Sequence, residues 1–227
     1  MKKLIYLFLA FPLFMGAQDL YWYDVMLEIP RETRESAETL IKDYYSNIDI
    51  PLDVNLSFSR IPLKGENVEA THMLSMFSTS AKSLANFRGS LSGEKWNIYT
   101  SGMQGLANVT SSMAGNVLVG MNYDKAGPLG QVWIFKVHAK DTGKFVEAFA
   151  KLMKTFKPTG LIANGQFTHG NSDGESMFVY GTSKDLTEAF STGPTNKKEA
   201  DAFQTFFNEI SFAEFSQSQT RVLIKQF

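Results

Sequence analysis

The chain has 227 residues, of which 44% are hydrophobic and 20% charged, and these proportions are ordinary for a folded protein. It contains no cysteine, which excludes disulfide bonds, thiolate metal sites and a cysteine nucleophile. The formal net charge is −1 and no basic run is clustered, so neither nucleic acid nor an anionic membrane is an expected partner.

The first 17 residues have the pattern of a secretory signal peptide. Lys2 and Lys3 precede an unbroken apolar run, Leu4–Met15, and small residues follow it. This run is too short to span a bilayer comfortably. We therefore expect cleavage after Ala17 and export to the periplasm or the extracellular space, the alternative being an uncleaved membrane anchor. No stable membrane insertion is expected once the leader is removed.

Residue patterns predict strands and helices in alternation through the first half. The clearest strand has apolar residues at 54, 56 and 58 and polar residues between them, which predicts one apolar and one polar face. The predicted elements are a strand at Tyr21–Ile29, a helix at Arg31–Asn47, strands at Asp53–Ile61 and Thr71–Ser78, helical stretches at Ser80–Phe87 and Glu94–Val109, and a strand at Asn116–Tyr123.

The second half predicts the same order of elements. Its first helix is strongly amphipathic, and the composition of Asn171–Gly174 is typical of a tight hairpin turn. The predicted elements are strands at Gln131–His138, Leu161–His169, Ser176–Thr182 and Thr220–Phe227, with helices at Thr142–Phe156 and Lys197–Phe212.

An internal repeat links the two halves. Phe77–Phe87 reads FSTSAKSLANF and Tyr180–Phe190 reads YGTSKDLTEAF, an offset of 103 residues. A fixed internal period indicates two copies of one supersecondary unit. The Thr-Ser pair in each copy opens a helical stretch, where hydroxyl groups cap free amides, and this explains the pairs better than a nucleophilic role.

The order βαββαβ is the ferredoxin-like arrangement. Two such units in one chain resemble the dimeric α+β barrel superfamily in its fused form, in which two sheets face each other and helices cover the outside. That superfamily includes antibiotic-biosynthesis-monooxygenase-like proteins, stress-responsive barrel proteins, haem-degrading monooxygenases and chlorite-dismutase-like proteins. The resemblance implies an α+β fold in which two tandem ferredoxin-like repeats, residues 18–127 and 128–227, form a pseudo-dimeric α+β barrel.

The haem-binding branch of this superfamily is a poor match. Its haem-degrading members carry an Asn, Trp and His constellation, and here Trp96 adjoins Asn97 without a histidine spaced to join them. We therefore expect no haem and no other cofactor.

The candidate site lies where the two predicted sheets face each other. If Val25, Leu27 and Ile29 face helices, the opposite row of that strand faces the interior and ends at Glu28. The equivalent strand of the second copy places Lys136 there. A polar lining with apolar walls is typical of a small-molecule pocket. The predicted ligand-binding residues are Glu28, Asn55, Lys136, His138, Asn164 and Gln166.

No metal site is predicted. The three histidines, His72, His138 and His169, occur singly on predicted strands without metal-binding spacing, which favours surface positions. His138 could act as a general base with Glu28 as its carboxylate partner. The alternative to a ligand-binding role is that Glu28 and Lys136 form an exposed ion pair.

Three functions remain open from the sequence. The favoured one is an exported binding or accessory protein that holds a small organic molecule, because no catalytic constellation is present. The alternative is a cofactor-independent monooxygenase-like enzyme, in which the substrate itself activates oxygen. The third is a structural or protein-interaction module without a pocket. The oligomeric state is not predicted.

Overall fold

The computed structural model describes residues 20–170 and 174–227. The predicted leader and positions 171–173 of the predicted turn lie outside the described residues. The strands are β1 (Leu20–Glu28), β2 (Val54–Lys64), β3 (His72–Ser78), β4 (Asn108–Met121), β5 (Leu129–Lys136), β6 (Ile162–His169), β7 (Glu175–Ser183) and β8 (Glu214–Gln226). The helices are α1 (Arg34–Ser46), α2 (Ala81–Ser90), α3 (Gly93–Met103), α4 (Thr142–Thr155), α5 (Leu186–Phe190) and α6 (Lys197–Glu209), with 3-10 turns η1 (Tyr123–Lys125) and η2 (Ala139–Asp141).

All eight strands form one closed antiparallel barrel in the order β1-β3-β2-β8-β5-β7-β6-β4. The predicted fold class, two tandem βαββαβ ferredoxin-like repeats forming a pseudo-dimeric α+β barrel from two facing sheets, is therefore wrong. Backbone pairing between β2 and β8 and between β4 and β6 joins the two halves into a continuous sheet. The interior is consequently a barrel lumen.

Two long strands close the barrel. β4 has 14 residues and β8 has 13, whereas strands of about five or six residues are usual. One end of β4 pairs with β1 and the other with β6, and β8 joins β5 to β2 in the same way. The sequence predicted only the C-terminal parts of both strands, and it extended a helix to Val109 where β4 has already begun. The omitted parts, 108–115 and 214–219, pair mainly with β1 and β5 of their own halves, whereas the predicted parts carry most of the pairing with the other half.

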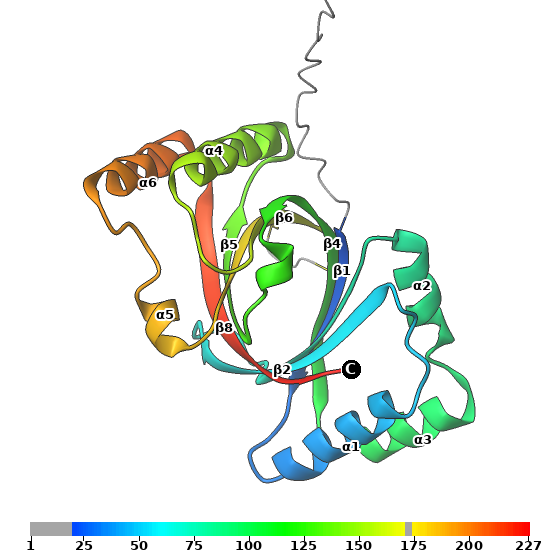
Figure 1. The fold of residues 1–227 in the computed structure, drawn as a ribbon. Helices are drawn as coiled ribbons and strands as arrows, with labels where there is room; N and C mark the ends of the chain where they lie inside the picture. The colour runs from blue at the N-terminus through cyan, green and yellow to red at the C-terminus, as the bar shows by residue number, and fades with distance from the viewer. Residues whose placement is uncertain (1–19, 171–173) are drawn as a thin grey trace, which may run out of the picture.

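Helices cover two opposite sides of the barrel (Figure 1). α1, α2 and α3 lie along the side that contains β1 and β3, and α4 and α6 lie along the side that contains β5. No helix of the described residues is long and apolar enough to cross a bilayer.

The helix-facing side of β1 begins the first core. Leu27 and Ile29 are buried there, as the strand alternation predicts, and they pack with Ala37, Ile41 and Tyr45 of α1. The core continues onto β2 and β3 and reaches α2 and α3. Further buried members are Val54, Leu56, Phe58, Leu74, Met76, Leu84, Phe87, Leu91 and Tyr99.

The second core, under α4 and α6, is filled mainly by phenylalanine rings. Phe145 and Phe149 of α4 are almost completely buried, and Phe206 of α6 packs edge to face against Phe145. Phe135 of β5 packs edge to face or tilted against neighbouring rings. Large rings dominate such cores because each buries a large area.

The lumen of the barrel is lined by the opposite row of the strands. Trp22 of β1 packs edge to face against Phe167 and Phe178. Gly115, opposite Trp22 on β4, makes room for this ring, because a Cβ there would lie 2.8 Å from it and 1.9 Å from a backbone oxygen. Gly165 makes room for Phe178 in the same way.

Candidate functional site

A cleft of about 300 Å³ opens on the outer side of the barrel, between the strands and the α2–α3 pair. β1 and β3 form its floor, and α2, α3 and the segment between them form its roof. The floor is mainly apolar, with Val25, Leu27, Leu74 and Met76, and Tyr23 lies beside them. The roof contributes Arg88, Leu91, Trp96, Tyr99, Thr100 and Met103.

Helix capping helps to hold the roof in place. α2 begins at the Ser80 cap, whose side chain accepts a hydrogen bond from the Ser83 amide at 3.1 Å. Leu84 and Phe87 of α2 are buried in the first core, so the helix presents its next residue, Arg88, toward the cleft. α3 is fixed through Tyr99, which is only 6% exposed.

An aromatic cluster stands at one end of the cleft. Tyr99 stacks on Tyr44 with ring centroids 4.3 Å apart, and it meets Tyr45 and Trp96 at 5.8 and 5.4 Å. Burial raises the pKa of Tyr99 and that of Tyr45 well above 10. Both side chains are therefore neutral phenols at physiological pH and can offer hydrogen bonds without carrying charge.

A second depression of similar volume lies between the end of α1 and the α2–α3 connection. Its lining is largely polar, with Asn47, Asp49, Ser92 and Lys95. Ligand sites usually have mostly apolar, aromatic walls with few polar groups. The cleft over β1 and β3 fits that description better, and it is the candidate functional site.

The six predicted site residues do not gather into one pocket. Glu28 ends β1 and Lys136 ends β5, and these strands stand four places apart in the ring of eight, on opposite walls. Glu28 accepts a hydrogen bond from Asn108 at 3.4 Å, and Lys136 lies 3.7 Å from Glu214. The predicted pair across the interior is therefore absent, since each residue has a nearer neighbour.

The other predicted residues are dispersed as well. Asn55 is exposed on the lumen row near one end of the barrel, and His138 is exposed at the start of η2. Asn164 and Gln166 point outward, because their register partners on β7 belong to the core under α4 and α6. The predicted inward orientation of these two side chains is wrong. The lumen row of β6 instead carries Ala163, Gly165 and Phe167, which fit around the buried rings.

Sequence reasoning missed a polar group inside the lumen. Arg221 of β8 donates hydrogen bonds to the Tyr180 hydroxyl at 2.5 and 3.1 Å and to the Ser75 hydroxyl at 2.9 Å. Asp24 lies close to both Arg221 and Ser75. A lone arginine in a strand gives no sequence signal of a partner that lies more than 140 residues away.

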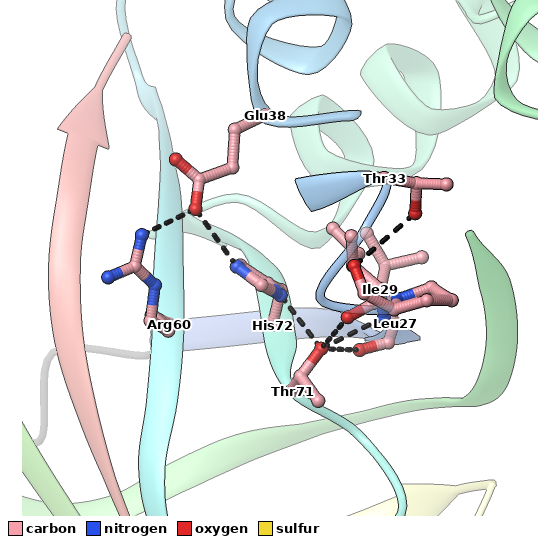
Figure 2. Close-up of polar contacts among 8 residues, drawn as sticks. Leu27, Ile29, Thr33, Glu38, Arg60, Thr71 and His72 are labelled. Carbon is pink, nitrogen blue, oxygen red and sulfur yellow. Dashed lines mark hydrogen bonds and ion pairs between the residues drawn. The ribbon is translucent and has the colours of Figure 1, made fainter. Parts of the chain in front are cut away.

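His72 is completely buried, contrary to the predicted surface position. Figure 2 shows its polar contacts. Its Nδ1 lies 2.8 Å from the Thr71 hydroxyl and its Nε2 lies 3.3 Å from a Glu38 carboxylate oxygen. That oxygen also accepts a hydrogen bond from Arg60 at 2.6 Å. The Thr71 hydroxyl in turn accepts from the Ile29 amide at 2.9 Å. This network joins α1 to the barrel, and its members do not line the candidate cleft.

Within the described residues, no three His, Asp or Glu side chains are arranged to hold a metal ion. The only titratable groups that line the cleft are tyrosines and Arg88. The cleft therefore presents a neutral aromatic wall and one cation to whatever it binds.

No protein-family profile matches the chain, and no curated protein matches it. Solved structures do. A candidate monooxygenase from Fusobacterium nucleatum subsp. nucleatum ATCC 25586 has a TM-score of 0.60 at 12% identity, over 92% of this chain and 93% of its own. An anthrone oxidase-like protein has a TM-score of 0.57 at 11% identity, over 93% and 94%. A candidate chlorite dismutase has a TM-score of 0.53 at 8% identity, over 91% of this chain and 95% of its own.

The chain shares its overall fold with these monooxygenase-like and chlorite-dismutase-like structures. The predicted resemblance is confirmed at this level, whereas the fused tandem form is not. The closed eight-stranded ring agrees with the chlorite-dismutase-like neighbour. At identities of 8–12% these likenesses show the fold alone.

Proposed function

We propose that the protein binds a small, flat organic molecule in the cleft between β1, β3 and the α2–α3 pair. The observation that carries this proposal is the aromatic cleft of about 300 Å³, which lies at the lower end of the size range of ligand pockets. Tyr23 and Trp96, which are partly exposed, provide ring surface for a flat ligand, and stacked or edge-to-face ring pairs are favourable. The predicted export would make it an extracytoplasmic binding protein.

Partly buried side chains support the choice of this side. Tyr23, Val25 and Trp96 line the cleft and remain only partly buried. Apolar surface left partly open in a concave site is the usual mark of ligand binding.

A cleft-blocking substitution tests the proposal. The probe is the neutral dye N-phenyl-1-naphthylamine, whose fluorescence rises in apolar surroundings. Thr100 lines the cleft and Ser101, the next residue of α3, is exposed. We expect Thr100→Phe to weaken dye binding about tenfold or more by filling the space, and Ser101→Phe to leave it unchanged. Equal binding by both variants and the unmodified protein would remove the cleft as a site.

Oxygen-dependent oxidation is a second candidate function, favoured by the monooxygenase and anthrone oxidase-like neighbours. Oxygen uptake with anthrone as the substrate, measured for Thr100→Phe and Ser101→Phe, tests this second function. Oxidation of anthrone to anthraquinone consumes one O₂, placing one oxygen atom in the product and releasing the other as water. Oxygen uptake above the rate in buffer, lost in Thr100→Phe and kept in Ser101→Phe, would support the enzyme. Oxygen uptake at the buffer rate would contradict the enzyme function, and binding would remain as the proposed function.

A further inference from the structure

Arg88 is held at the edge of the cleft by two aromatic rings. Its guanidinium carbon lies 5.5 Å from the Tyr23 ring centroid and 5.9 Å from that of Trp96. Both are within the range of a cation–π contact. Because Tyr23 comes from β1 and Trp96 from α3, the guanidinium is positioned between the floor and the roof of the cleft.

No carboxylate among residues 20–170 and 174–227 forms an ion pair with Arg88. Arg34, which is also partly buried, resembles Arg88 in this respect, whereas two other arginines do have partners. Arg60 pairs with Glu38, and Arg221 is hydrogen-bonded and close to Asp24. The residues that line the cleft include no Asp or Glu, so its only formal charge is positive.

Charge and solvation then restrict the ligand. Arg88 is half-buried, and a molecule that fills the cleft would remove more of its water. Desolvation of an unpaired cation is costly unless an opposite charge replaces the lost water. Arginine suits this role, because its planar fork of donors matches carboxylate and sulfonate oxygens.

We propose that the cleft selects flat organic anions, with the negative group bound by Arg88 and the ring system placed against the aromatic wall. The class comprises aromatic carboxylates, sulfonates and phenolates. This inference rests on the proposed binding function and adds to it the charge of the ligand.

Two dyes with the same ring skeleton separate charge from shape. N-phenyl-1-naphthylamine is neutral, and 8-anilino-1-naphthalenesulfonate carries a sulfonate on that skeleton. We expect the sulfonate dye to bind the unmodified protein more tightly, and Arg88→Met to weaken its binding about tenfold or more while changing neutral-dye binding less than about twofold. Arg88→Lys should retain most of the preference.

Lys82→Met is the matched control, since Lys82 is an exposed cation on the same helix and its loss changes the net charge equally. It should change neither affinity. Each variant is first compared with the unmodified protein by urea unfolding, so that a folding defect is recognised. If both dyes bind the unmodified protein equally, or if Arg88→Met weakens both alike, the anion inference is overturned while the cleft stands. If neither dye binds, the proposed function fails with it.

Discussion

Asp24 is an ionisable side chain that points into a closed barrel. One of its carboxylate oxygens is buried without a hydrogen-bond partner. Burial raises the pKa of Asp24 from 3.8 to about 6, although the attraction of Arg221 and a hydrogen bond from Ser75 act in the opposite direction. The native state therefore holds this proton more strongly than the unfolded chain does.

The sign of the resulting pH dependence follows from proton binding. Between about pH 3.8 and pH 6 the folded protein binds more protons at Asp24 than the unfolded chain, so this group makes the protein less stable as pH rises. The full difference corresponds to at most about 3 kcal/mol, and partial access to solvent reduces it to about 1–3 kcal/mol. Asp24→Asn should remove this dependence.

Urea unfolding at pH 4 and pH 7 measures the effect. We expect the stability of Asp24→Asn relative to the unmodified protein to rise by about 1–3 kcal/mol between these pH values. Parallel changes in the two proteins would show that Asp24 titrates in the native state as it does in the unfolded chain.

Asp24 belongs to the row of β1 opposite Val25 and Leu27, which the sequence predicted to face the interior, because alternation along a strand fixes which residues share a face. No sequence signal indicated Arg221 or Arg88 as site residues. Each owes its role to rings and hydroxyls that come from other elements, such as Tyr180 for Arg221 and Trp96 for Arg88. From the sequence alone, a charged residue in a strand or helix is expected to lie on the solvated surface. Its role becomes visible only when the positions of its partners are known.

α1 is attached to the barrel by polar contacts as well as by its apolar face. The His72 Nε2 donates to Glu38 of α1 when that carboxylate is ionised, and the Nδ1 then accepts from Thr71. Burial lowers the pKa of His72 below 6.5, although Glu38 acts to raise it. The ring is therefore neutral in the native protein at pH 7.

Acidification should weaken this attachment. As pH falls through 6.5, the unfolded chain takes up a proton at His72 while the native protein resists it, so stability is lost. This is the opposite sign to that of Asp24. We expect His72→Gln to cost about 1–3 kcal/mol at pH 7 through lost hydrogen bonds, and the cost to shrink toward pH 5.

His169→Gln is the control for this prediction, because His169 is exposed at the end of β6. Urea unfolding of both variants between pH 7 and pH 5 gives the comparison. A His72→Gln cost that stays constant over this range, or an equal pH trend in His169→Gln, would show that His72 does not titrate differently in the native protein.

The sequence did not predict the full lengths of β4 and β8. The segments 108–115 and 214–219 are rich in small and polar residues and lack a long apolar alternation. Pairing with a neighbouring strand, mainly β1 for 108–115 and β5 for 214–219, makes them strands. Such tertiary pairing overrides local propensity. The clear alternation at 54, 56 and 58, by contrast, predicted β2 from its own residues.

The shared strands should make the molecule unfold as one unit. Each half has its own core, but the ladders β2–β8 and β4–β6 connect them. We expect a single calorimetric transition whose van't Hoff and calorimetric enthalpies agree. Phe149→Ala, in the second core, should lower stability by about 3–5 kcal/mol and shift the whole transition downward. Two resolved transitions in the variant would show that the halves unfold independently.

The closed ring also determines how this protein can meet other chains. An open sheet presents rows of unpaired amides and carbonyls at its edges, and these recruit further strands into aggregates and fibres. Here each of the eight strands has a neighbour on both sides. We therefore expect resistance to strand-templated aggregation at high concentration. We expect self-association of the described chain to use mainly side chains on the helices and on the outer faces of strands.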